Sequence, residues 1–219
     1  MNTMPVADPE TAAVHVMQAA PRLIKVAGAT AISFGLWEGA CHVLDPAPTA
    51  VQDAHEIANG YCGVSALMTV IRLALLLDAD PKVVSFQSVY KCLQRREVVN
   101  ALTRRFCVES QFPAHTQGNI RHSVNRFLDT YKAIDWADLH GRLMHFRNRG
   151  VAHLDPREIE SRITNDEVRS LVYSVTILGE CLEPFAPNVV PVRQDEIEDW
   201  GDRAAAVWRA ATRAEPRLN

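Results

Sequence analysis

Apolar residues recur every three or four positions along almost the whole chain, and this repeat constrains the fold more than any other feature. Such spacing marks one face of an α-helix, whereas a half-buried strand alternates every two residues. The only β-branched run, Val189 and Val190 with Val192, is interrupted by Pro191, which argues against a strand. We therefore predict an all-α fold, an up-and-down helical bundle in which sequential helices are mostly antiparallel neighbours.

Turns rich in proline and aspartate divide the repeat into helices. The N-terminal segment can form one helix or two, because Pro21 and three glycines are able to break it. Ser85 is a candidate N-cap, and Thr164 forms a candidate capping box with Glu167. A turn is expected at Pro113 and Gln117-Gly118-Asn119. The ranges expected to be helical are 8–41, 51–77, 86–97, 98–109, 120–134, 135–146, 168–182 and 195–214.

The long helix expected at 51–77 carries an apolar stripe, which we predict to face the centre of the bundle. Residues 1–183 are expected to form the bundle, including the N-terminal helix. Residues 184–219 would add a proline-linked C-terminal helix that packs on it. The stripe of the 51–77 helix consists of Ile57, Tyr61, Val64, Met68, Ile71 and Leu75.

The composition, 47% hydrophobic and 22% charged over 219 residues, is that of a soluble globular protein. The uncharged stretch from Val26 to Trp37 is shorter than the roughly 18 residues of a membrane span, and the N-terminus has no secretory signal pattern. Five scattered cysteines without a C-x-x-C pair fit reduced thiols better than disulfides or zinc ligands. We expect a cytoplasmic protein with no membrane partner, no cofactor and no metal.

Charge is unevenly distributed along the chain. The segment from Lys91 to His153 holds 11 Lys and Arg against 5 Asp and Glu, although the whole chain has a net charge of −3. A basic segment of this kind can present a patch to phosphates. Solvated helix faces that carry no ligand are the alternative interpretation.

The most reactive set of side chains is Arg147 and Asn148 followed by His153. An arginine supplies a fixed cation and a histidine a proton shuttle, and together they suit a phosphate. On an unbroken helix Arg147 and His153 would lie about 120° apart, whereas Arg149 and His153 would lie about 40° apart. A break at Gly150 would let the first pair converge. Alternatively, these cations only satisfy the last carbonyls and the dipole of a helix.

The pattern Arg147-Asn148-x-x-x-x-His153 resembles the Arg-x(4–6)-His motif of the HEPN (higher eukaryotes and prokaryotes nucleotide-binding) superfamily, which favours a polar residue after the arginine. Upstream, Arg72-Leu73-x-x-x-Leu77-Asp78 followed by Val84-Ser85-Phe86 resembles the AbiU-type branch of HEPN, known from bacterial abortive-infection systems. The resemblance covers about residues 51–182. The glycine at position 150 departs from the pattern.

The resemblance implies a metal-independent endoribonuclease that acts as a toxin or phage-defence effector, with two chains forming one composite cleft. His153 would move a proton at the RNA 2′-OH, Arg147 would hold the phosphate, and Asn148 would orient either one. Arg149 and Arg72 are candidate RNA contacts, and for Arg72 a structural role at the edge of the core is the alternative. RNA, a second copy, and an antitoxin or nucleotidyltransferase are the implied partners. Two alternatives to the ribonuclease remain: a non-catalytic HEPN-like module that binds RNA, a nucleotide or a protein, and a purely structural interaction protein.

Overall fold

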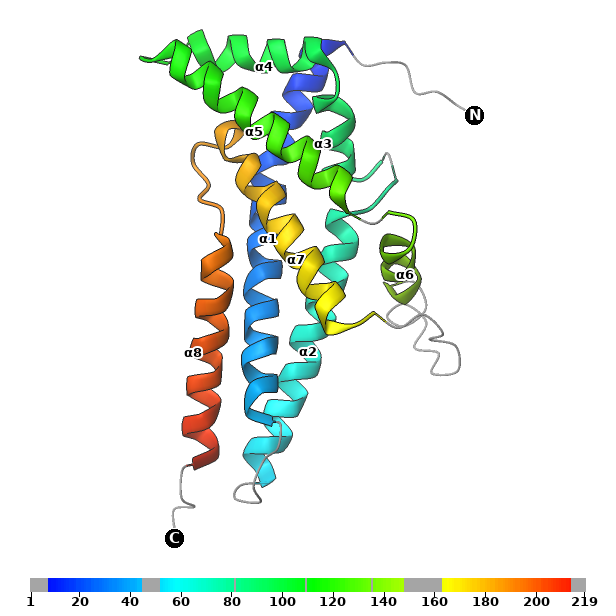
Figure 1. Cartoon of the computed structure of the whole chain (residues 1–219), viewed down its shortest axis with the longest axis vertical. Coiled ribbons are helices and arrows are strands. Elements are labelled where there is room, and N and C mark those ends of the chain that lie inside the picture. Colours follow the sequence, from blue (N-terminus) through cyan, green and yellow to red (C-terminus); the bar gives the residue numbers. More distant parts are fainter. Residues whose placement is uncertain are drawn as a thin grey trace.

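The computed structural model describes residues 8–44, 52–80, 82–108, 110–134, 136–147 and 163–213. Within these ranges the chain is helical and has no strand, which confirms the predicted all-α fold. Figure 1 shows the N-terminal helix between the C-terminal helix and the second helix, with the helices of residues 86–133 gathered at one end. The described helices are α1 (Pro9–Leu44), α2 (Gln52–Leu76), α3 (Phe86–Leu93), α4 (Arg96–Val108), α5 (Pro113–Ala133), α6 (Leu139–His145), α7 (Asn165–Cys181), the single 3-10 turn η2 (Glu183–Phe185) and α8 (Gln194–Arg213).

The centre of the fold is α1, which packs against α2, α7 and α8 along its length and against α3, α4 and η2 near its start (Figure 1). The sequence left open whether this segment forms one helix or two, and the structure shows one helix that continues through Pro21. Most of its buried positions are alanine or glycine, so neighbouring helices approach closely on several sides. Its fully or nearly fully buried residues are Ala12, Ala13, Val16, Ala19, Ala20, Leu23, Ile24, Ala27, Gly28, Thr30, Ala31, Phe34, Gly35, Gly39 and Ala40.

The glycines of α1 do not break the helix; they let α8 approach its backbone. A Cβ atom added at Gly35 would lie 2.6 Å from the carbonyl oxygen of Ile197. One added at Gly39 would lie 2.7 Å from the Cβ of Ala204 and would also collide with the carbonyl oxygen of Gly201. No side chain fits at these two positions without moving α8.

The apolar stripe of α2 faces the opposite way from the prediction. Ile57, Val64 and Leu75, three of its six residues, are 64%, 61% and 47% exposed. The buried face lies on the other side of the helix and includes Leu73 and Leu76. The helix is apolar on both faces, and spacing alone cannot decide which of two apolar faces turns inward. For the same reason residues Glu56–Leu76 are, among those described, the one helical stretch long and apolar enough to cross a membrane, judged by length and composition alone.

The caps predicted from the sequence are present. Ser85 caps α3 in a capping box with Ser88, and Thr164 and Glu167 form the capping box of α7. The turn predicted at residues 117–119 is wrong, because α5 starts at Pro113 and runs straight through Gly118. Proline suits the first turn of a helix, since the amide it lacks would have no intrahelical partner there. At Gly118 an added Cβ would meet nothing within 4 Å.

The last helix, α8, packs on α1 rather than on its sequence neighbour α7 (Figure 1). The connection includes η2 and the ion pair between Glu183 and Arg193, whose side chains approach to 2.7 Å. The division of the chain at residues 183 and 184 stays a prediction.

Substitution of Gly39 by alanine tests the close contact between α1 and α8. We expect Gly39→Ala to lower the free energy of unfolding by about 1–3 kcal/mol, the usual effect of overpacking. Gly118→Ala is the matched control in an open helical position, where alanine should raise stability by about 0.5–1 kcal/mol. Chemical denaturation followed by circular dichroism measures both. Equal stability of the two variants would contradict the packing described for α8.

Candidate functional site

The helix that leads into the Arg-Asn-His motif is short. α6 spans only Leu139–His145, and the chain continues through Phe146 and Arg147 in a wider, π-helical turn. Leu139 and Leu143 are buried, and Arg147 follows them on the same inward side. Because a helix of seven residues is not stable alone, side-chain contacts with other elements must hold it in place.

Arg147 is held by Asp78, which lies just beyond the end of α2. Its Nη1 donates to Oδ2 of Asp78 at 2.8 Å, and the two side chains are 27% and 14% exposed. Burial alone would raise the pKa of the Asp78 carboxyl, but hydrogen bonds from the Asp80 amide and from Arg147, together with the charge of His140, leave it below its ordinary value of 3.8. The carboxylate therefore stays ionised beside the guanidinium at neutral pH.

Arg142 ties α6 to the start of α7. Its guanidinium donates to Glu167 at 2.5 Å and to Asp138 at 2.8 Å. Glu167 also accepts from the backbone amide of Thr164, so one carboxylate completes the N-terminal cap of α7 and binds α6. The helix was expected to begin at residue 135, but it begins after Asp138, which makes no side-chain cap there. Asp138 pairs with Arg142 instead.

Aromatic rings provide a third set of contacts that hold α6 in place. His140 makes a hydrogen bond through Nε2 with the carbonyl oxygen of Leu77 at 2.9 Å, at the end of α2. Trp136 lies 4.8 Å from the His140 ring and 4.5 Å from the Tyr131 ring, and its indole N–H donates to the Tyr131 carbonyl. Tyr131 stacks on Tyr90 at 4.1 Å. These rings connect α6 to the core of the bundle.

Of the other predicted site residues the structure describes Arg72, and its described contacts do not lead to Arg147. The guanidinium of Arg72 is directed to α1, where it donates to the Ala29 carbonyl at 2.9 Å and to the Ser33 hydroxyl. Its described partners are thus neutral oxygens of α1, which fits a structural role at the edge of the core, and contact with RNA stays a prediction. Asn148, Arg149, Gly150 and His153 lie outside the described residues, and the predicted break at Gly150 lies there with them.

The residue that sequence reasoning missed is Asp78. It had been noted as part of the upstream Arg72-to-Asp78 pattern and as a helix-ending residue, but it was given no partner. Its contact with Arg147 spans 69 positions, so no local spacing could reveal it. The available signal was the inward position of Arg147, because a partly buried guanidinium requires an anion or carbonyls nearby.

An apolar cavity of about 420 Å³ lies beside this site. Phe146, the residue before Arg147, forms part of its wall, with Trp37 of α1 opposite and Asn165 at the start of α7. Leu67 and Val70 of α2 complete much of the lining. Arg147 itself is not among the lining residues, so the cavity offers an apolar surface near the arginine but not the guanidinium.

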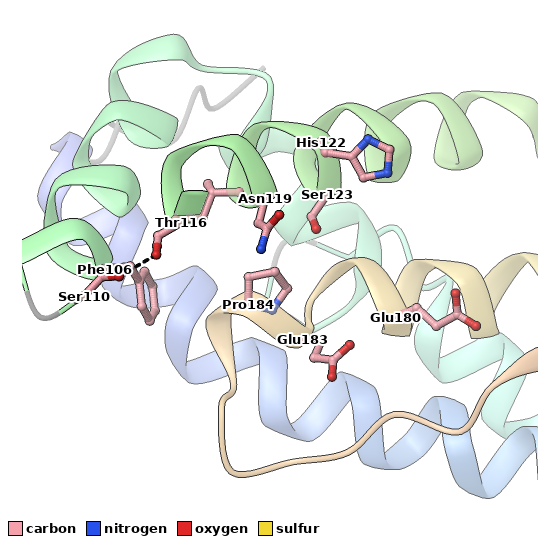
Figure 2. Close-up of a pocket in the computed structure, with 10 residues that line it drawn as sticks. Phe106, Ser110, Thr116, Asn119, His122, Ser123, Glu180, Glu183 and Pro184 are labelled. Atoms are coloured by element: carbon pink, nitrogen blue, oxygen red, sulfur yellow. Dashed lines mark hydrogen bonds between the residues drawn. The ribbon is translucent and has the colours of Figure 1, made fainter. Parts of the chain in front are cut away.

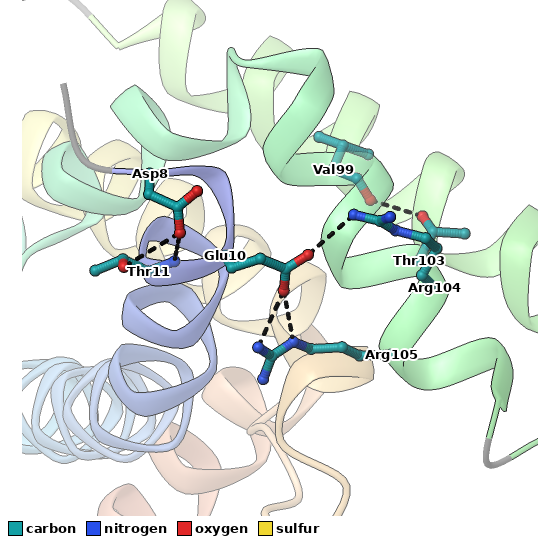
Figure 3. A network of polar contacts seen from close by, with 7 residues as sticks. All are labelled: Asp8, Glu10, Thr11, Val99, Thr103, Arg104 and Arg105. Carbon is teal, nitrogen blue, oxygen red and sulfur yellow. Dashed lines mark hydrogen bonds and ion pairs between the residues drawn. The ribbon is translucent and has the colours of Figure 1, made fainter.

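The basic segment is partly neutralised by carboxylates from other helices. Figure 3 shows Arg104 and Arg105, on α4, both paired with Glu10 at the start of α1, at 2.9 and 3.0 Å. On α5, Arg126 pairs with the nearly buried Glu180 at 3.0 Å. Carboxylates from outside the segment therefore offset part of its excess of basic residues.

A second, polar cavity of about 630 Å³ lies between α5 and the far end of α7, shown in Figure 2. Asn119, His122 and Ser123 of α5 face Glu180 and Glu183 across it. Both glutamates are already paired with arginines, Arg126 and Arg193. The α7 helix separates this cavity from α6 by its full length, about 25 Å for 17 residues, so it is not part of the Arg147 site.

Comparison of the chain with family models, curated proteins and solved structures finds no match. In the described part of the chain no three His, Cys, Asp or Glu residues gather as metal ligands. The described side chains of the site offer a guanidinium fixed by a carboxylate, able to bind a phosphate in competition with it.

We expect acid to weaken the attachment of α6 to α7, because protonated Glu167 loses its ion pair with Arg142. The hydrogen bonds from Arg142 and then from the Thr164 amide lower the pKa of Glu167 from 4.5 to about 2. A depressed folded-state pKa contributes stability above pH 4.5 that is lost as pH falls toward 2. We expect Glu167→Gln to lower the free energy of unfolding at pH 7 by about 1 kcal/mol and to flatten the pH dependence between 4.5 and 2.

Denaturation curves collected across this pH range measure the effect. Asp166→Asn is the matched control, because Asp166 occupies the same turn with its side chain 87% exposed. An acid transition of Glu167→Gln that coincides with that of the wild type would contradict the role given to Glu167.

Proposed function

We propose that this chain is a metal-independent endoribonuclease of the HEPN type that acts in the cytoplasm as a toxin or phage-defence effector. The observation that supports it best is the position of Arg147 at the end of α6, partly exposed and fixed by Asp78. A catalytic cation must be held in one orientation to stabilise a developing charge. Asn148 and His153 follow it in the sequence.

The proposed reaction cleaves RNA through its own 2′-OH. His153 accepts the 2′-OH proton or supplies one to the leaving oxygen, since its ordinary pKa of about 6.5 suits both directions. Arg147 holds the scissile phosphate, and Asn148 orients the histidine or the phosphate by hydrogen bonding. One arginine and one histidine are few for this reaction, so a second copy supplies the other half of a composite site. An antitoxin or a nucleotidyltransferase is the further partner that this class of protein implies.

The ion pair between Arg147 and Asp78 favours a second candidate. A guanidinium that is already satisfied by a carboxylate needs no substrate to explain its burial. The same arrangement therefore supports a non-catalytic HEPN-like module that binds RNA, a nucleotide or another protein. The two candidates differ in one measurable property, the cleavage of bound RNA.

Purified protein incubated with RNA without added metal tests the proposal. We expect wild-type protein to produce fragments that end in a 2′,3′-cyclic phosphate and to leave DNA of the same sequence intact. His153→Ala should reduce the rate about 100- to 10,000-fold, the usual contribution of acid–base catalysis. Arg147→Ala should reduce it about 100- to 1,000-fold, the usual loss when one stabilising donor is removed.

Arg149→Ala is the matched control, because Arg149 is the arginine to which the proposal gives no catalytic role. Its rate should stay within about tenfold of the wild type, which allows for one lost phosphate contact. Wild-type protein that binds RNA without cutting it would select the non-catalytic module. Equal loss in Arg147→Ala and Arg149→Ala would remove the specific role of Arg147.

A further inference from the structure

The outward face of α2 carries an unusual row of apolar side chains, Ile57, Tyr61, Val64, Met68, Ile71 and Leu75, here named the outer stripe. Its members follow one another at alternating steps of four and three residues. At about 100° per residue this spacing keeps all six on one side of the helix. The line of buried residues, which includes Leu73 and Leu76, lies on the opposite side.

The outer stripe is exposed although it has the composition of a core. Ile57 and Val64 are more than 60% exposed, and Leu67, 41% exposed, extends the surface to one side. From Ile57 to Ile71 the helix has no charged residue. A helix that is apolar all round is normally covered on every side, and a contiguous exposed apolar surface marks an interaction site.

A lipid bilayer is a poor fit to this surface because of the helices beside it. α8 lies along α1 and next to α2, where the ring of Trp208 is 5.6 Å from that of Tyr61. It carries Asp195, Asp199 and Arg203, among other charges. Hydrocarbon around α2 would surround those charges as well, at a cost of several kcal/mol for each residue near the bilayer centre.

A second copy of the same helix fits better. Apolar residues at alternating four- and three-residue steps form the seam along which two helices pack side by side in a coiled coil. The six side chains expose on the order of 500 Å² in one chain, so complete contact between two copies would bury about 1,000 Å², the lower limit for a specific interface. An uncharged surface also meets its own copy without like-charge repulsion.

We propose that two copies of this chain associate through the outer stripe of α2. The purpose of this dimer, which is to complete a composite site, rests on the proposed function. The exposed apolar surface of α2 does not depend on that function. Leu75 lies three residues before Asp78, the partner of Arg147. A parallel pairing of the two α2 helices therefore brings both Arg147 side chains to the same end of the dimer, where a composite site would form.

The oligomeric state of the full chain tests the proposal. Light scattering after size exclusion, with sedimentation equilibrium for the dissociation constant, should give a dimer for the wild type. Val64→Glu places two carboxylates in the middle of the seam, and we expect the dissociation constant to rise at least about 100-fold. Val108→Glu is the matched control, since Val108 is 85% exposed on α4, away from the outer stripe.

A dimeric Val108→Glu variant beside a monomeric Val64→Glu variant of unchanged circular dichroism spectrum and melting temperature would support the proposal. A monomeric wild type, or a Val64→Glu variant that stays dimeric, would overturn it. Flotation of a monomeric wild type with phosphatidylcholine vesicles would overturn it in favour of a membrane. A dimer that leaves RNA intact would contradict the proposed ribonuclease activity but not the interface. RNA cleavage by a monomeric wild type would contradict the interface but not the ribonuclease activity.

Discussion

The close packing of α1 is the constraint on which the rest of the structure depends. Its buried face is made mostly of alanine and glycine, with Gly35 and Gly39 where α8 packs against it. Small side chains bury little area each, so the helix gains stability from the number of neighbours that touch it rather than from large residues of its own. α2, α7 and α8 each use one side of α1. This leaves α2 with a second face that α1 cannot cover, and the apolar residues on that face stay exposed.

The position of α6 follows from the same arrangement. Its seven residues are too few to form a stable helix without help, and its supports come from the ends of helices that α1 holds. Leu77 and Asp78 stand at the end of α2, and Glu167 stands in the first turn of α7. The motif arginine is therefore placed by long helices and by polar side chains at their ends. A site built in this way depends on the helix ends more than on the helix that carries the motif.

Features that depend on neighbouring residues could be predicted from the sequence, whereas contacts between residues far apart in the chain could not. The caps at Ser85 and Thr164 were predictable because each depends on residues within one turn. The exposure of the α2 stripe could not be predicted, since both faces of α2 are apolar and satisfy the same spacing. Gly118 was misread as a turn because glycine marks turns only on average, and an open helical position tolerates it. The partner of Arg147 lay 69 positions away and was beyond any local pattern.

The charge balance at Arg147 limits what the site can do by itself. Asp78 remains ionised at neutral pH because its pKa lies below the ordinary value, so the pair with Arg147 carries no net charge to attract a phosphate. A second pair brought by another copy would be equally neutral. Attraction of an anion must then come from further cations, and Arg149 is the nearest one in the sequence. On a regular helix Arg149 is the better neighbour of His153. In the proposed ribonuclease it would contribute charge, whereas the fixed geometry belongs to Arg147.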